Sequence, residues 1–253
     1  MIHDLRTILD GWDFEPGKIS VRKIIGRDGR EKIQTRIDLG VLQMDCAGRP
    51  DGLRPQACES LLDYQEQRLR AHIAVSGSDD DFRLSPDECR ELRHEAYLYY
   101  QRYLSLYVLE EFDGVERDTT RNLRVIDLCE RYGSAARDRE LLQAQRAYVM
   151  MMNTRAKAQL ALARGRADSA LSIVENGISD LERQYDEDAE DDSWLREADT
   201  LRALRREVLD RLPDDAPAKL QSELEWALAT EDYEQAAKLR DRLGSASPRR
   251  PTA

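Results

Sequence analysis

The stretch that decides the fold is residues 158–171, with the sequence AQLALARGRADSAL. Leucine and alanine recur at helical spacing on both sides of Gly165, and glycine allows the tight turn that joins two helices. Ala158 and Ala170 flank this turn, and small residues at a helix crossing allow the helices to approach closely. The stretch therefore predicts a pair of antiparallel helices.

The same stretch resembles the tetratricopeptide repeat, with Val174 and Gly177 at its later packing positions. In that family an aromatic residue usually follows the turn glycine, and Ala167 stands there in this chain. The resemblance implies an antiparallel helical-hairpin array over residues 76–212, which exposes a groove for segments of partner proteins. A looser match surrounds Gly114 and includes Tyr107, Thr119, Leu123 and Ile126.

Helical patterns extend from Gln56 toward the end of the chain, so we expect a mainly α fold. Ser85 followed by Pro86 is typical of a helix start, because serine caps the first turn and proline suits its first position. Asp113 and Gly114 predict a break between helices. The expected helices cover residues 56–75, 86–112, 116–132, 138–163, 167–185, 193–212 and a short pair within 217–243.

The helix expected over 86–112 is rich in tyrosine. Tyr99, Tyr103 and Tyr107 are spaced by four residues, which favours packing between helices. Tyr97 and Tyr100 fall on another flank. They are therefore the better candidates to line a groove that binds a partner, since tyrosine offers apolar area with a polar tip.

Residues 220–243, LQSELEWALATEDYEQAAKLRDRL, predict a second and smaller helical pair. Leu220, Leu224 and Ala227 lie on one apolar stripe, and a second stripe follows Asp232. A unit of two short helices buries too little surface to be stable alone. It therefore needs a partner surface in the same chain, in a second copy or in another protein.

This stretch resembles the UVR motif of the bacterial excision-repair subunits UvrB and UvrC and of the stress regulator McsA. The resemblance implies a docking module over residues 213–244, for a protein partner or for a second copy of the chain. An intramolecular cap packed near Trp194 and Trp226 is the alternative, and residues 245–253 are expected to be disordered. The implied partner-binding residues are Glu231, Asp232, Tyr233, Glu234, Ala236, Ala237, Leu239, Arg240 and Leu243.

Residues 1–75 contain the only β-like pattern. Apolar residues alternate near 18–26 and 31–39, and Asp28-Gly29 between them is a strong hairpin signal. The second run continues toward Met44. Because a lone hairpin is marginal in water, it must lie on a helix, add a strand from beyond Gly40 or pair with a second copy.

Basic side chains gather on this hairpin and suggest an alternative function. They would contact nucleic acid if they formed a local patch, although the chain as a whole is acidic and repels phosphate. Acidic and arginine side chains between Arg36 and Asp51 favour structural ion pairs over catalysis. The candidate nucleic-acid contacts are Arg22, Lys23, Arg27, Arg30, Lys32 and Arg36.

Composition excludes several classes of protein. The chain has 253 residues and a formal net charge of −11, and no apolar run approaches a membrane span. The start of the sequence does not resemble a signal peptide, so we expect a cytoplasmic protein. The four cysteines lack zinc-site or C-x-x-C spacing, and no phosphate-binding loop of the Walker type is present, so neither a metal nor another cofactor is expected.

Together these observations predict a non-catalytic adaptor or scaffold that binds proteins through the UVR-like hairpin and the helical groove. We expect a homo-oligomer with no membrane contact, and nucleic acid is not an expected partner. The alternative is a regulatory subunit in DNA repair or the stress response, with nucleic-acid contacts from the N-terminal hairpin.

Overall fold

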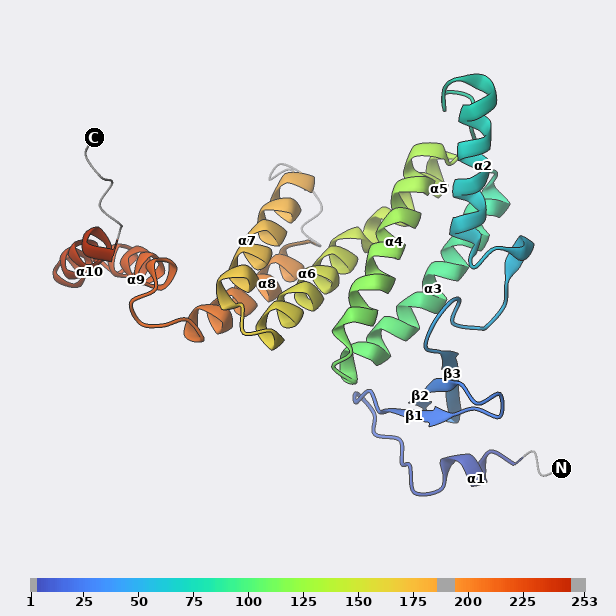
Figure 1. Ribbon diagram of the computed structural model, residues 1–253, viewed down its shortest axis with the longest axis horizontal. Helices are drawn as coiled ribbons and strands as arrows, with labels where there is room; N and C mark the ends of the chain where they lie inside the picture. The colour runs from blue at the N-terminus through green and yellow to red at the C-terminus, as the bar shows by residue number, and fades with distance from the viewer. Residues whose placement is uncertain (1–3, 186–193, 247–253) are drawn as a thin grey trace. The chain divides into compact units, whose positions relative to one another are not determined.

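The computed structural model describes residues 4–185 and 194–246 and is mainly helical (Figure 1). The predicted fold class, with a small β element near the N-terminus and a helical pair near the C-terminus, is confirmed. The chain forms two compact units, residues 1–157 and 158–253. This division lies inside the segment 76–212, whose boundaries as one array stay a prediction. Of the tail expected to be disordered, residues 247–253 lie outside the described part.

The first unit combines a sheet with long helices. Its strands are β1 (Val21–Ile25), β2 (Glu31–Ile37) and β3 (Gly40–Asp45). Its helices are α1 (Arg6–Leu9), η1 (Pro55–Ala57), α2 (Leu61–Ser76), α3 (Pro86–Val108), α4 (Phe112–Tyr132), α5 (Ala136–Glu140) and η2 (Gln143–Gln145). Helix α6 (Arg146–Ala163) contains the division, and the second unit continues with α7 (Ala167–Gln184), α8 (Leu195–Asp210), α9 (Pro217–Ala229) and α10 (Tyr233–Ala246).

The sheet is antiparallel with the order β1-β2-β3, so the hairpin gains a strand from beyond Gly40. Ile33 pairs with Lys23 on one side and Met44 on the other. Between β1 and β2 the chain turns at the expected Asp28-Gly29, where Gly29 has φ +74° and donates its N–H to the Gly26 carbonyl. The run expected to continue to Met44 instead turns after Ile37 and forms β3.

The turn between β2 and β3 depends on Arg36. Ile37 pairs with Gly40, so only Asp38 and Leu39 form the loop, and neither has a positive φ. Two-residue loops normally use positive φ to match the twist of the strands. Here the Arg36 guanidinium donates to the carbonyls of Ile37, Asp38 (2.9 Å) and Gly40 (3.0 Å), and to that of Trp12 (2.9 Å). One side chain therefore holds the turn closed.

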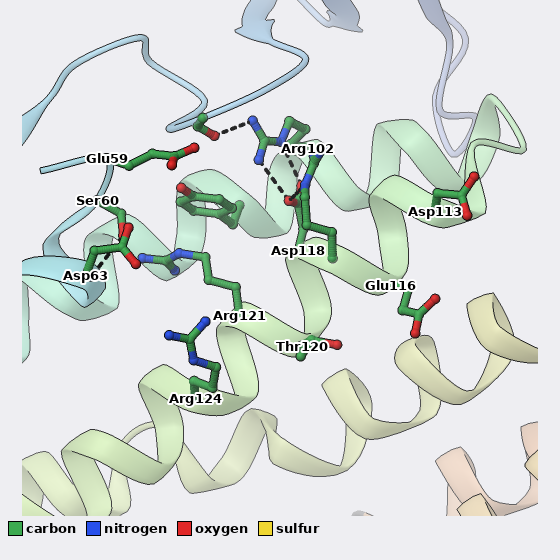
Figure 2. Close-up of a pocket in the computed structure, with 13 residues that line it drawn as sticks. Glu59, Ser60, Asp63, Arg102, Asp113, Glu116, Asp118, Thr120, Arg121 and Arg124 are labelled. Atoms are coloured by element: carbon green, nitrogen blue, oxygen red, sulfur yellow. Dashed lines mark hydrogen bonds and ion pairs between the residues drawn. The ribbon is translucent and has the colours of Figure 1, made fainter. Parts of the chain in front are cut away.

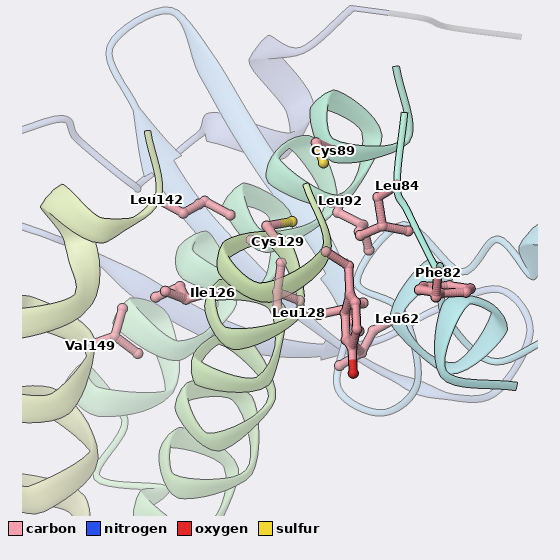
Figure 3. Close-up of a cluster of buried hydrophobic side chains, with 13 residues drawn as sticks. Leu62, Phe82, Leu84, Cys89, Leu92, Ile126, Leu128, Cys129, Leu142 and Val149 are labelled. Atoms are coloured by element: carbon pink, nitrogen blue, oxygen red, sulfur yellow. The ribbon is translucent and has the colours of Figure 1, made fainter. Parts of the chain in front are cut away.

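One face of the sheet packs on the helices through Ile33, which is fully buried, and Thr35, whose hydroxyl lies 2.6 Å from that of Ser105 in α3. Beyond the sheet, an apolar cluster fills the space between α2, α3 and α4 (Figure 3). Leu84 contributes to this cluster and pairs with Gly133 like a short strand. Its buried members are Leu62, Phe82, Leu84, Cys89, Leu92, Ala96, Val125, Ile126, Leu128, Cys129, Tyr132, Leu142 and Val149.

The junction between α3 and α4 differs from the sequence prediction. The chain breaks at Glu110, which has φ +59°, and Gly114 lies inside α4 rather than in a turn. A Cβ atom on Gly114 would lie 2.8 Å from Cδ1 of Leu106 in α3. This glycine therefore serves the close approach of two helices, and the looser repeat match around it stays a prediction. The helix expected over 138–163 is also interrupted, between α5 and α6.

Buried charges join the parts of the first unit. Arg102 of α3 is 1% exposed and forms a double ion pair with Asp118 of α4, at 2.7 and 2.8 Å. The remaining terminal nitrogen of Arg102 donates to the carbonyls of Asp45 (3.0 Å) and Gly48 (2.7 Å) after β3. This arginine therefore ties the sheet to both long helices.

Glu95 of α3 forms a second buried centre and is fully inaccessible to solvent. Its carboxylate accepts hydrogen bonds from the first N–H groups of α2, Leu61 (2.8 Å) and Leu62 (3.3 Å), and pairs with Arg121 and Arg49. Burial lowers the pKa of Arg121, and the charge of Glu95 opposes that effect. A negative charge at a helix N-terminus is favourable, so Glu95 fixes where α2 begins.

The second unit contains two helical turns with the same hydrogen bonds. After α6, Arg166 N–H donates to Ala161 (2.9 Å) and Gly165 N–H to Leu162 (2.9 Å). After α9, Asp232 N–H donates to Ala227 (2.8 Å) and Glu231 N–H to Leu228 (3.2 Å). Both are Schellman endings, which place one residue in the left-handed region. That residue is Gly165 (φ +69°) in the first turn and Glu231 (φ +59°) in the second.

Helix α8 packs along α7, where Arg202 pairs with Glu182 and Arg205 with Glu175, each at 2.9 Å. The buried apolar residues of α7 and α8 are Ala170, Leu171, Val174, Leu181, Ala198, Leu201, Leu204, Val208 and Leu209.

In the described part of the chain, every helix is too short or too polar to cross a membrane.

Replacing Arg102 by methionine is expected to lower the free energy of unfolding of the first unit by about 3–5 kcal/mol, because Asp118 is left buried without its partner. The measurement is urea unfolding followed by Trp12 fluorescence, in a chain whose Trp194 and Trp226 are phenylalanine. The control is Arg124→Met, which removes an exposed pair with Glu66 and should cost below about 1 kcal/mol. Equal losses for the two variants would contradict the role given to Arg102.

Replacing Glu231 by glycine is expected to stabilise the α9–α10 turn by about 0.5–1 kcal/mol, because glycine adopts positive φ without the steric cost borne by glutamate. Hydrogen exchange at the amides of α10 measures the change. The control is Glu225→Gly, at an exposed position in the middle of α9. It should lower the protection of the same amides against exchange by about 1 kcal/mol, because glycine destabilises a helix. Faster exchange in both variants would show that the turn at Glu231 is unstrained.

Candidate protein-binding site

The α9–α10 hairpin has a small core of its own. Leu220, Ala227, Ala236 and Leu239 are buried, and Leu224 and Leu243 pack against them from the edges. Alanines at the centre allow the two helices to approach closely, and Asp232 caps α10 by accepting the N–H of Gln235 at 3.0 Å. The hairpin thus forms from a few small and apolar residues.

The outer surface of this hairpin carries large apolar side chains. Trp226 is 72% exposed, Tyr233 67% and Leu228 51%. Exposed tryptophan and tyrosine are the residue types that most often dominate the energy of protein interfaces. A cleft of about 490 Å³ lies beside Trp226, between α9 and α10, with Ala227 and Leu239 among its lining residues. Side chains that protrude next to a hollow form a surface suited to binding another protein.

Charge is unevenly distributed along the hairpin. Carboxylates gather near the turn, at Glu223, Glu225, Glu231, Asp232 and Glu234. Basic residues lie toward the open end, at Lys219, Lys238, Arg240 and Arg242. There Lys219 pairs with Asp214 at 2.6 Å, and this pairing lowers the pKa of Asp214 and raises that of Lys219. Near the turn, Glu234 pairs with Lys238 at 2.7 Å, and both side chains are exposed, so Glu234 can exchange this lysine for a basic group of a partner at little cost.

The residues implied by the motif divide between the core and the surface of the hairpin. Ala236 and Leu239 are buried, and Leu243 packs against them, so these three hold the helices together. The remaining implied residues, which are exposed, are Glu231, Asp232, Tyr233, Glu234, Ala237 and Arg240. Trp226 and Leu228 are exposed although they were not among the predicted contacts, and Trp226 was expected only as a packing residue of the alternative intramolecular cap.

Trp194 and Trp226 have different surroundings in the structure. Trp194 is buried and stacks on Tyr185, with ring centroids 6.0 Å apart, whereas Trp226 is largely exposed. Trp226 is therefore largely uncovered within the described residues. The intramolecular cap expected near these two tryptophans stays an untested alternative.

The tyrosines of α3 separate as the spacing predicts. Tyr99 and Tyr103 are buried, and burial raises the pKa of both phenols. Tyr97 is 55% exposed and stacks on Tyr100 at 6.1 Å, and Tyr100 contacts Tyr148 at 6.3 Å. Tyr97 and Tyr100 thus form an aromatic surface, whose role as a groove stays a prediction.

The basic residues of the sheet are occupied within the first unit. Arg22 donates to Gln34 and to the Ile8 carbonyl and lies 4.0 Å above the Trp12 ring. Lys23 pairs with Glu111, which raises the pKa of the lysine. Of the other candidates, Lys32 and Arg30 bind Asp28 and Asp45, Arg36 holds its turn, and Arg27 is exposed. Most of these basic groups are therefore paired within the first unit, and nucleic-acid contact stays an untested alternative.

A second cleft, of about 510 Å³, lies near the start of α2 and along α4 (Figure 2). Arginines from α3 and α4 line it together with carboxylates from α2, from α4 and from the segment before α2. Arg102 and Arg121 have carboxylate partners, and Arg124 forms a double contact with Glu66. Its charges are therefore largely balanced within the protein.

Comparison with known proteins identifies the C-terminal hairpin. Residues 218–246 match the family model described as the UvrB/uvrC motif. No curated protein matches the chain, and no solved structure does. The matched range covers most of α9 and all of α10, including the exposed Trp226 and Tyr233. The resemblance of residues 220–243 to the UVR motif is therefore confirmed, and it lies on the helical pair formed by α9 and α10.

Proposed function

We propose that this protein is a non-catalytic adaptor that binds a partner protein through the outer surface of its UVR hairpin. The observation that carries the proposal is the exposure of Trp226, Tyr233 and Leu228 on a hairpin whose own core is already complete. These side chains add nothing to the packing of α9 on α10, so their apolar area has another use.

The partner's surface can be described from the hairpin. It offers an apolar pocket for Trp226, and basic side chains that face the carboxylates of Glu231, Asp232 and Glu234. Because those carboxylates are exposed, they contribute mainly to the rate of association and to the choice of partner. Another helical hairpin of the same motif meets this description, in a second protein or a second copy.

A photo-reactive amino acid at position 226 tests the proposal in the cells that make the protein. The expected result is a covalent adduct with a protein that mass spectrometry identifies. The matched control is the same amino acid at Gln221, which is also exposed on α9 and lies outside the aromatic surface. Equal adducts from both positions would contradict a specific site.

With the captured partner purified, Trp226→Ala is expected to weaken binding by about 30-fold or more, since central aromatic residues commonly contribute at least about 2 kcal/mol. Titration calorimetry measures the dissociation constant. Gln221→Ala should change it by less than about twofold. A wild-type affinity in Trp226→Ala would assign the binding to another surface.

A further inference from the structure

Leu39 stands at the tip of the β2–β3 turn and is 88% exposed. Turn tips usually carry small or polar residues, because an exposed leucine gains nothing there. This turn is also rigid, since Arg36 binds three of its carbonyls and lies 5.8 Å from the Phe14 ring. A large apolar side chain is thus held out from the protein at a fixed position.

A cleft of about 420 Å³ lies beside this turn. Its walls come from the N-terminal arm, the end of β2 and α3, and the apolar part includes Phe14, Ile37 and Leu104. Ile19 also lines the cleft and is 46% exposed, and Ile37 is 41% exposed. The protruding leucine and the apolar hollow therefore lie on neighbouring parts of one surface.

We propose that this surface binds a second copy of the chain, with Leu39 of each copy inserted into the cleft of the other. A two-fold axis makes both contacts at once, because a protrusion and a hollow on one patch are self-complementary. The cleft volume is ample for a leucine side chain. The rigid turn lowers the conformational entropy lost on association.

Charges at the rim of the cleft favour the same occupant. Lys18 and Asp38 both line the cleft, and Asp38 precedes Leu39. Insertion of Leu39 brings Asp38 of one copy toward Lys18 of the other. Within the described residues, Lys18 pairs with Glu15 at 3.1 Å, and both side chains are about two-thirds exposed, so the lysine can exchange partners at little cost. A dimer with a two-fold axis contains this contact between Asp38 and Lys18 twice.

This surface is separate from the UVR hairpin, and the inference stands whether or not that hairpin binds a partner. The two sites together would give the adaptor a pair of docking hairpins. A bivalent protein gains avidity wherever its partner is also clustered.

Light scattering after size-exclusion chromatography of the full chain, over a series of concentrations, tests the inference. The wild type is expected to reach the mass of a dimer, and Leu39→Asp to weaken the dimer about tenfold or more. Leu53→Asp is the matched control, because Leu53 is 61% exposed and lies outside the cleft. Circular dichroism should show the same melting temperature for Leu39→Asp as for the wild type, since Leu39 makes no buried contact.

A charge exchange adds a second test. Lys18→Asp and Asp38→Lys should each weaken the dimer, and the double variant should restore it. A wild-type monomer at every concentration would overturn the inference, as would equal effects of Leu39→Asp and Leu53→Asp. Loss of the dimer in Trp226→Ala but not in Leu39→Asp would assign self-association to the UVR hairpin and overturn it as well.

Discussion

The first unit depends on guanidinium groups buried against carboxylates. Removing such charges from water costs several kcal/mol per ion, and this cost is offset only where the geometry of the pair is good and the remaining donors are satisfied. Arg102 meets both conditions, because its nitrogens reach Asp118 and two backbone carbonyls after β3. An alternative packing that moved the sheet on the helices would leave these charges buried and unpaired. The pair therefore specifies one arrangement of sheet, α3 and α4.

Arginine has the same structural task at the edge of the sheet. Arg36 supplies donors to a turn that lacks positive φ, and Arg22 bridges Gln34 and the carbonyl of Ile8 in the N-terminal arm. These two arginines count as basic residues in the sequence, but in the structure they donate hydrogen bonds to other groups of the protein. A count of basic residues therefore overstates the positive surface, since a guanidinium that serves the backbone or a carboxylate is no longer available to phosphate.

Sequence patterns correctly predicted the turns and the helix start that depend on interactions within a few residues. Gly165, the Asp28-Gly29 turn and the Ser85-Pro86 helix start act within a few residues of themselves, and all three lie where the sequence placed them. None of Glu95, Arg102 and Asp118 was singled out from the sequence, because the burial of these charged residues depends on partners far along the chain. The contact of Arg102 with Asp45 spans 57 residues. Gly114 was misread for the same reason, since its role depends on Leu106 in the neighbouring helix.

The two Schellman turns of the second unit join helical pairs that differ in how much packing surrounds them. The helical pair at Gly165 continues into α8, which packs along α7 and completes a larger core. In the described residues, the pair at Glu231 has a buried core of Leu220, Ala227, Ala236 and Leu239. Two helices cannot cover all of each other's surface, and here Trp226 and Tyr233 are both largely exposed. A hairpin with a core of alanines and leucines and with exposed aromatic residues therefore supports the proposed docking surface, because aromatic side chains commonly dominate the energy of protein interfaces.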